Sequence, residues 1–139
     1  MISNFKGKYF YLSNYYNSPV IYEGIKYKNN EAAFQSMKTL DIKLRKSFSL
    51  LEPNEAKYKG RNIKLREDWE EVKDDIMYNI VLEKFKQNPD LKKRLISTGN
   101  EELIEGNSWN DTYWGVCLGH GQNKLGEILM KVRNELRCK

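Results

Sequence analysis

Glu31 and Lys38 are the residues whose types and spacing best suit chemistry. They stand about two helical turns apart, so that together with Gln35 they lie on one stripe of an expected helix. A carboxylate and an amine in this arrangement can hold the two ends of a small reacting group, with the carboxylate as acid, base or nucleophile. A structural role for Glu31 stays open, because a carboxylate in the first turn also stabilises the helix macrodipole.

Two lysines on the longest expected helix depart from its apolar pattern. At about 100° per residue, Lys73 falls between Met77 and Ile80 on the apolar face. It can point a cation into a pocket, or pack its stem on the core while the ammonium reaches water. Lys84 lies near the same face but closer to the helix end, where the ammonium reaches water more easily, so it is the weaker candidate.

A long loop supplies a second set of candidates. Residues 105–115 and 119–123 combine Gly, Asn, Asp and two Trp without regular periodicity, and a constrained loop of this kind more often serves a binding site than a core. Its aromatic rings can still be local plugs over the core. Asn123 most simply caps the final helix, and its amide can alternatively meet a ligand.

Several common chemistries lack their residues. The chain has one histidine, His120, and two cysteines outside any CxxC pair, which is too few for a zinc signature. Phosphate-loop, dinucleotide-binding and serine-hydrolase motifs are also missing. We therefore expect no metal and no cofactor, and chemistry from carboxylates, lysines, amides and aromatic rings.

Length and charge limit the remaining possibilities. The 139 residues suit one domain, 1–139, and no apolar run approaches the roughly 20 residues needed to cross a bilayer. The N-terminus does not resemble a secretory signal, so we expect a cytoplasmic protein with no membrane partner. The net charge of +5 suits an anionic ligand, but it is also ordinary for a lysine-rich surface.

The elements that must position these residues are mostly helical. Residues 20–27 alternate around the turn-prone Glu23-Gly24 and predict a hairpin. Asn30 is the expected N-cap of the next helix and Gly60 the expected stop of a later one. The helices are expected at about 31–40, 42–51, 53–58, 68–87, 89–95 and 123–136, with another helical turn at 101–104. The predicted fold class is therefore mainly α, a compact multihelical single domain with a short N-terminal β-hairpin.

Several of these segments together resemble a known family. They are FYLSNYY at 10–16, EAAFQSMK at 31–38, Asp68-Trp69 with Lys73 and Met77, DTYWG at 111–115 and NKLGEILM at 123–130. In this order and spacing, nearly the whole chain resembles the NADAR, or YbiA-like, N-glycosidase family. One departure is Ala32, where many relatives have His, so a mechanism that depends on that His cannot be transferred.

The resemblance implies a YbiA-like fold and a metal-independent hydrolase of N-glycosyl bonds. The expected bond joins ribose C1 of a ribose-phosphate or ADP-ribose unit to an exocyclic amine. Two substrate classes follow from the family: ribosylamino-pyrimidine intermediates of riboflavin synthesis and ADP-ribosylated guanine, including ADP-ribosylated DNA. No obligate protein partner is expected.

Two mechanisms use the residues available. Expulsion of the amine through an oxocarbenium-like state needs two carboxyl groups, for which Glu31 and Asp111 are the candidates. Exchange through a Schiff base needs a neutral lysine, with Lys38 first and Lys73 second. The expected substrate-binding residues comprise two aromatic walls, two orienting amides, two phosphate-binding cations and a glycine: Trp69, Trp114, Asn14, Asn123, Arg61, Lys73 and Gly115.

Two other classes of protein remain open from sequence. The same Trp and Lys residues can hold a nucleotide or nucleic acid without catalysis. A basic face can also dock an acidic protein surface. Turnover separates the enzyme from both.

Overall fold

The computed structural model describes residues 1–138. Its backbone contacts divide into two compact units, which we describe separately: the central unit, Asn14–Gln87, and the terminal unit, which combines Met1–Ser13 with Asn88–Lys139. The expectation of a single domain over 1–139 stays a prediction.

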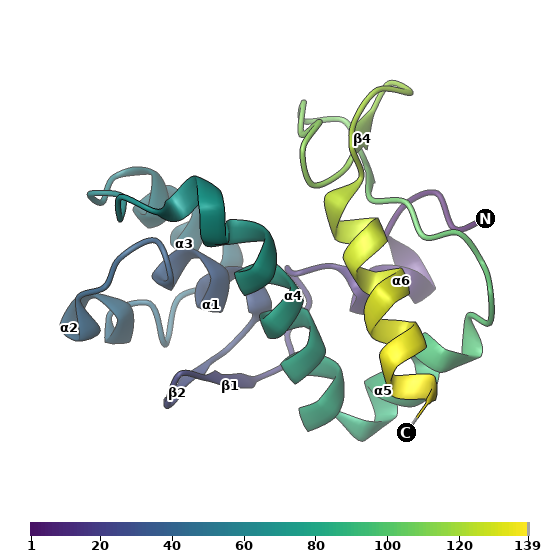
Figure 1. Cartoon of the computed structure of the whole chain (residues 1–139), viewed down its shortest axis with the longest axis horizontal. Helices are drawn as coiled ribbons and strands as arrows, with labels where there is room; N and C mark the ends of the chain where they lie inside the picture. Colours follow the sequence, from purple (N-terminus) through teal and green to yellow (C-terminus); the bar gives the residue numbers. More distant parts are fainter. Residues whose placement is uncertain (139) are drawn as a thin grey trace. The chain divides into compact units, whose positions relative to one another are not determined.

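The central unit begins with a hairpin and continues with helices (Figure 1). Its elements are β1 (Val20–Tyr22), β2 (Ile25–Tyr27), α1 (Asn30–Ser36), α2 (Ile42–Lys46), α3 (Pro53–Arg61) and α4 (Trp69–Gln87). The antiparallel strands are joined by Glu23 and Gly24, whose φ angles of 50° and 80° are those that a tight hairpin turn requires. The predicted hairpin is therefore confirmed.

Helix α1 differs from its prediction at both ends. Its N-cap is Asn29, whose side chain accepts a hydrogen bond from the Ala32 backbone at 2.8 Å. The expected cap, Asn30, is already in the helix. Helix α1 also ends at Ser36, and Leu40, expected on its apolar face, is exposed. The helix was predicted too long because the apolar residues keep a helical spacing as far as Leu40, although the helix ends at Ser36.

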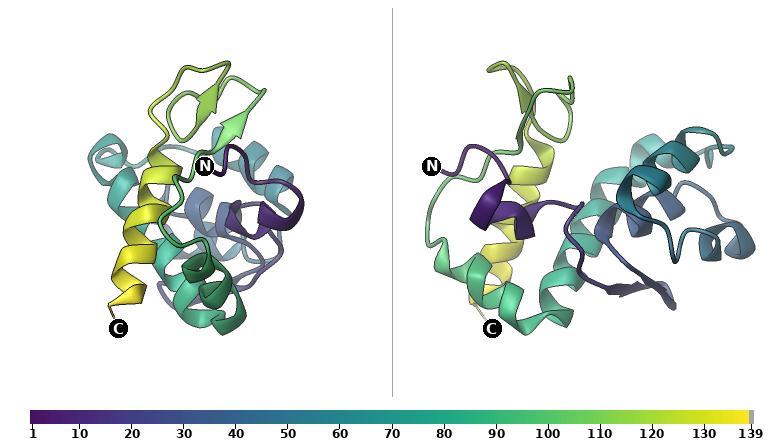
Figure 2. Two further views of the ribbon diagram at one scale, coloured as in Figure 1. Left: turned by 90° about the vertical axis from the view of Figure 1, so that its right-hand side faces the viewer. Right: turned by 180° about the vertical axis from the view of Figure 1, so that it is seen from behind.

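Helix α3 continues through Gly60, so the predicted stop at this residue is wrong. A Cβ at position 60 would collide with the Gln35 side chain. The glycine is therefore needed for the close packing of α3 on α1, which lie side by side in Figures 1 and 2. The helix begins with a capping box formed by Glu52 and Glu55, with Pro53 at its first position.

Helix α4 confirms the predicted long helix but not the expected position of Lys84. The side chain of Lys84 is 1% exposed, and its ammonium lies 5.2 Å from the Phe85 ring centre and 5.7 Å from that of Tyr16. Burial lowers the pKa of Lys84 to about 7. The expectation that this lysine reaches water is wrong, because the loop around Tyr16 covers it.

The terminal unit is built around its last helix. Its elements are η1 (Gly7–Leu12), α5 (Pro89–Ser97), β3 (Gly106–Asn107), β4 (Val116–Cys117) and α6 (Lys124–Arg137). Strands β3 and β4 pair in parallel. The predicted helical turn at 101–104 is wrong, because Ile2 pairs with this segment in extended form: its N–H donates to the Glu102 carbonyl and its carbonyl accepts from the Ile104 N–H.

Each unit has an apolar interior of its own. Most of the buried apolar residues belong to the hairpin and helices, and Phe48 and Leu103 lie in connecting segments. They are Val20, Tyr27, Phe48, Met77, Ile80 and Phe85 in the central unit, and Leu12, Leu95, Leu103, Leu129 and Val132 in the terminal unit. Among residues 1–138, no helix combines the length and apolar character needed to cross a bilayer. The mainly α-helical fold with a short N-terminal hairpin is confirmed.

Candidate functional site

Glu31 and Gln35 form the buried start of the site on α1. The Gln35 amide donates to Glu31 Oε2 at 2.6 Å, one helical turn away. The Glu31 backbone N–H donates to the Asn14 carbonyl at 3.1 Å, which ties the first turn of α1 to the preceding loop. Both side chains are at most 9% exposed. The carboxylate is therefore held in one position by neighbours on its own helix and loop.

Lys38 lies just beyond α1, where the chain leaves the helix. Its carbonyl accepts from the Arg66 backbone N–H at 2.8 Å, and the Arg66 guanidinium also donates to the Met37 carbonyl. Arg66 is itself fixed by a two-pronged ion pair with Asp68, at 2.6 and 3.1 Å. This brace ends the helix and holds the backbone of Lys38 in place.

The surroundings of Lys38 make its amine easier to deprotonate. Burial lowers the pKa of Lys38; the Glu31 carboxylate opposes this, and the cations of Arg61, Lys57 and Lys73 lower the pKa further. The net shift is downward, so a larger fraction of the amine is neutral than for a lysine in water. The electrostatic coupling brings together residues from α1, α3 and α4, all within the central unit.

Tyr15 is a member of the site that sequence reasoning missed. Burial, and then the charge of Glu31, raise the pKa of Tyr15 to about 12, while Arg61 opposes the shift. The hydroxyl therefore keeps its proton at neutral pH. Its segment, FYLSNYY, was singled out, but three tyrosines at 11, 15 and 16 are alike in sequence. Lys57 was also missed, although it stands one turn before Arg61 on α3.

Two of the expected substrate-binding residues in this unit contact their protein neighbours. The Asn14 amide donates to the Met77 sulfur at 3.4 Å and its oxygen accepts from Asn30 at 3.4 Å. Trp69 is 5% exposed, and its ring centre lies 5.1 Å from that of Phe34. Their roles toward a substrate stay predictions.

Lys73 was expected either to point into a pocket or to reach water, and the structure places it partly buried. Its ammonium pairs with Glu70 at 2.7 Å, one turn earlier on α4, and its side chain is 16% exposed. Its charge also acts on Lys38. The position suits a cation at the edge of the site, and its binding role stays a prediction.

Asp111 and Trp114 lie in the terminal unit, in the long loop between β3 and β4. Asp111 Oδ1 accepts from the backbone N–H groups of Tyr113 and Trp114 at 3.1 and 2.9 Å. The Asn107 side chain bonds to both the N–H and the carbonyl of Asp111. The Trp114 ring meets Tyr113 edge to face at 4.8 Å. This loop is therefore ordered by its own polar side chains, as the sequence suggested.

Asn123 is the N-cap residue of α6, as predicted, but its side chain makes no capping hydrogen bond to the helix. Its backbone is left-handed, with φ of 53°. Its amide donates to the Leu103 carbonyl and its oxygen accepts from the Glu105 N–H, both at 2.9 Å. A Cβ at the neighbouring Gly115 would collide with Glu105. Asn123 and Gly115 thus join two segments of the loop, and their binding roles stay predictions.

Within residues 1–138, no group of three or more His, Cys, Asp or Glu residues is arranged to hold a metal ion. The central unit instead gathers a buried carboxylate, a lysine of lowered pKa, a protonated tyrosine and further cations. Such a set can move protons, supply an amine nucleophile and attract an anion. The fold and the site together define a mainly helical domain whose central unit holds side chains suited to enzymatic proton transfer and nucleophilic attack.

Comparisons with known proteins agree with this class. The model of the NADAR domain family matches residues 2–137. An N-glycosidase YbiA of Shigella flexneri is 36% identical over 128 residues, 89% of this chain and 79% of the relative. A riboflavin biosynthesis protein of Vibrio vulnificus is 35% identical over 131 residues, 91% of this chain but 35% of that longer protein. The NMR structure of Escherichia coli YbiA superposes with a TM-score of 0.86 at 32% identity, covering 99% of this chain and 88% of that one.

The chain belongs to the NADAR domain family. It is an N-glycosidase, a hydrolase that acts on N-glycosyl bonds, at the level at which its curated relatives are named. The family resemblance drawn from the motifs is confirmed.

Proposed function

We propose that this chain cleaves the bond between ribose C1 of a ribose-phosphate or ADP-ribose unit and an exocyclic amine, and that the reaction takes place at Glu31 and Lys38. The observation that carries the proposal is the electrostatic coupling of a buried carboxylate with a lysine of lowered pKa. A hydrolase that breaks a C–N bond needs a proton for the leaving nitrogen and a nucleophile for the carbon. The two side chains are of the types that supply these.

In one route, the amine leaves through an oxocarbenium-like state. Glu31 gives a proton to the leaving nitrogen or takes one from the attacking water, with the carboxylate held by Gln35. A catalytic role for Asp111 as a second carboxyl group stays a prediction from sequence. The Tyr15 hydroxyl, which keeps its proton at neutral pH, can donate a hydrogen bond to the sugar or the nitrogen.

In the other route, Lys38 forms a covalent intermediate. The ribosylamine opens to an imine, the lone pair of neutral Lys38 Nζ adds to C1, and the exocyclic amine leaves with a proton supplied by Glu31. Water then hydrolyses the lysine imine and regenerates the amine. The lowered pKa of Lys38 supports this route, because only the unprotonated amine can attack.

The cations around Lys38 support an anionic substrate. Arg61, Lys57 and Lys73 act on Lys38 from α3 and α4, and a phosphate or diphosphate beside them would be attracted by all three. The same charges that lower the pKa of Lys38 would thus be partly offset when the phosphate binds. Cytoplasmic location, metal independence and the absence of an obligate protein partner stay predictions.

The test incubates the purified protein with one substrate of each class, a phosphorylated ribosylamino-pyrimidine or DNA that carries ADP-ribosyl guanine. The products are identified by mass spectrometry. Release of free amine and ribose phosphate, or of guanine-containing DNA and ADP-ribose, supports the proposal and names the class. Borohydride added during turnover should leave a sugar adduct on the Lys38 peptide. Turnover without any lysine adduct would contradict the imine route, and no turnover of either substrate would contradict the proposal.

A further inference from the structure

The positive charge of this chain is concentrated in one part of the central unit. Residues 38–66 contain nine Lys or Arg and three Asp or Glu, a net charge of +6 against +5 for the entire chain. This segment comprises α2, α3 and the loop that leads to α4. The rest of the protein is therefore close to neutral, and the basic character noted from composition is a local feature.

The three acidic residues of this segment are used at helix N-termini. Asp41 Oδ1 accepts from the N–H groups of Lys43 and Leu44 at the start of α2. Glu52 and Glu55 form the capping box of α3. Because caps hold these carboxylates in place, they are not arranged to neutralise the lysines of the same segment.

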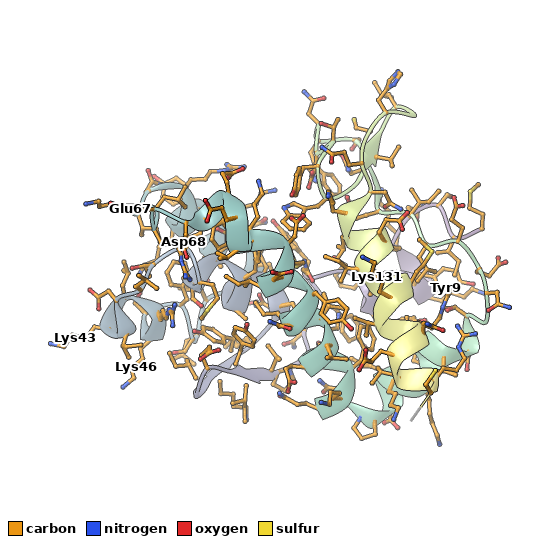
Figure 3. The ribbon with its side chains drawn as sticks, in the orientation of Figure 1. Tyr9, Lys43, Lys46, Glu67, Asp68 and Lys131 are labelled. Carbon is orange, nitrogen blue, oxygen red and sulfur yellow. The ribbon has the colours of Figure 1, made fainter. Side chains whose placement is uncertain are left out.

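Three lysines of the segment extend into solvent. Lys43, Lys46 and Lys64 are exposed, and none of them forms an ion pair within the described part of the chain. Figure 3 shows Lys43 and Lys46 projecting away from the ribbon of α2. Other cations of the segment are engaged differently, since Arg45 is buried and bonded to the Thr39 carbonyl.

The same basic segment carries an exposed aromatic ring. Tyr58 is 72% exposed on α3, between Lys57 and Lys59 in the sequence. A flat ring beside several cations offers a stacking surface for an unpaired base next to contacts for phosphates. Helix α3 also contributes to the candidate site, because its Lys57 and Arg61 act on Lys38.

We infer that Lys43, Lys46, Lys64 and Tyr58 form a binding surface for single-stranded nucleic acid, which we term the α2–α3 surface. A duplex is a poorer fit: α2 has five residues, and α3 presents the acidic capping box at the N-terminus, the end that a recognition helix directs at base edges. This surface binds an unmodified strand and needs no turnover. Failure of the binding and failure of the proposed N-glycosidase reaction are therefore separate outcomes.

The experiment measures binding of a fluorescent single strand of roughly 20 nucleotides by anisotropy, between about 50 and 200 mM KCl. The variant Lys43→Ala/Lys46→Ala/Lys64→Ala should bind at least about tenfold more weakly at the lowest salt. Its dependence of log K on log salt should be shallower by about 2, since three phosphate contacts contribute about 0.7 each. Its thermal unfolding should be unchanged, because all three side chains are exposed.

A matched control removes the same charge elsewhere. Lys6, Lys93 and Lys131 are exposed lysines of the terminal unit, and their triple Ala variant should keep the wild-type slope. Equal weakening by both triple variants would overturn the proposal, because the effect would then come from net charge alone. The proposal would also be overturned if the wild type bound a duplex of the same sequence, polyglutamate or anionic vesicles as tightly as the single strand or more tightly. Failure of the wild type to bind the single strand would overturn it as well.

Tyr58 provides an independent test of stacking. Tyr58→Ala should weaken binding about fivefold or more at every salt concentration without a change of slope, because it removes a ring and no charge. Tyr58→Phe should retain most of the affinity. Unchanged affinity in Tyr58→Ala would contradict the stacking contact and leave a purely electrostatic surface, which is not what we propose.

Discussion

The candidate site residues of the two units use their polar side chains in different ways. In the central unit, burial lowers the pKa of Lys38, the charge of Glu31 opposes this, and neighbouring cations lower the pKa further. In the terminal unit, Asp111 and Asn123 bond to backbone N–H and carbonyl groups. Arg133 there likewise donates to the Glu101 carbonyl and to a threonine hydroxyl.

This difference separates residues for chemistry from residues for order. A side chain that completes backbone hydrogen bonds stabilises a loop, and its removal leaves buried polar groups unsatisfied. A side chain whose charge acts on another titratable group can change protonation during a reaction. Changes at Glu31 and Lys38 should therefore reduce activity, and changes at Asn123 should reduce stability.

The largest expected effect is that of Glu31→Gln. We expect kcat/KM to fall by about 10²- to 10⁴-fold, the usual contribution of a general acid or base. The unfolding midpoint should change little, because glutamine keeps the size of the side chain. Steady-state kinetics together with urea unfolding check both parts, and near-normal turnover by the folded variant would remove Glu31 from the mechanism.

Asp111→Asn is the matched change in the terminal unit. Asparagine keeps an oxygen at Oδ1 for the two backbone N–H groups but removes the charge. Because the sequence predicts Asp111 as the second carboxylate, we expect turnover to fall while the free energy of unfolding stays unchanged, which would make Asp111 an exception among the polar residues of the terminal unit. Unchanged turnover would instead show that Asp111 only orders its loop, and it would contradict the catalytic role of Asp111.

Lys38→Arg should abolish the borohydride adduct and lower kcat/KM by about 100-fold or more, since arginine stays protonated. In the wild type, the trapping yield should rise with pH as the amine loses its proton. Because the pKa of Lys38 is lowered, this rise should be complete at a lower pH than for a lysine in water. Peptide mass spectrometry across the pH range measures it, and a pH-independent yield would contradict the assignment.

Asn123→Ala should destabilise the protein by about 2 to 3 kcal/mol. The change removes two hydrogen bonds, worth about 1 kcal/mol each, and places alanine at a positive φ. Asn123→Gly is the matched control, because glycine adopts this φ and loses only the hydrogen bonds. Urea unfolding should rank wild type above Gly and Gly above Ala; equal stability of all three would show that the side-chain bonds contribute nothing.

The smallest expected effect, when it is measured per pH unit, is the pH dependence introduced by Lys84. In the folded protein the pKa of Lys84 is about 7, whereas in the unfolded chain it is near its ordinary value. Above pH 7 the unfolded state therefore holds more protons, and stability should rise with pH toward about 10.5 by at most about 1.4 kcal/mol per pH unit. The cost of burying the charge is fully present below pH 7.

Lys84→Met removes this titration while keeping an unbranched side chain in the interior. Its urea stability should rise less steeply with pH than that of the wild type, and it should exceed the wild type at pH 6. Identical slopes for the two proteins would show that Lys84 does not titrate in this range when folded.

The sequence predicted those features that depend on neighbours in the chain. The β1–β2 hairpin and the long helix α4 follow from alternation, turn residues and helical spacing, and both are confirmed. The alignment of Glu31 with Gln35 also follows from helical geometry, and the two are in contact, whereas Lys38, expected on the same stripe, lies beyond the end of α1. Local rules succeeded here because the partners are within two helical turns of each other.

Other features required partners far apart in the sequence. The sequence predicted Gly60 as the end of a helix, but in the structure it lies within α3, where the absence of a Cβ leaves room for the Gln35 side chain from α1. Lys84 was expected to reach water, but the loop at Tyr16 covers it. The coupling of Tyr15 to Glu31 and Arg61 joins a loop with two helices.

The sequence by itself determined the family, the helical elements and the types of residue available for chemistry, because periodicity, turn residues and charge are properties of neighbouring positions. The tertiary structure decided which charges lie close to one another and which are removed from water. Those two conditions set the pKa values of Lys38 and Tyr15, since a pKa depends on burial and on charges contributed by distant segments.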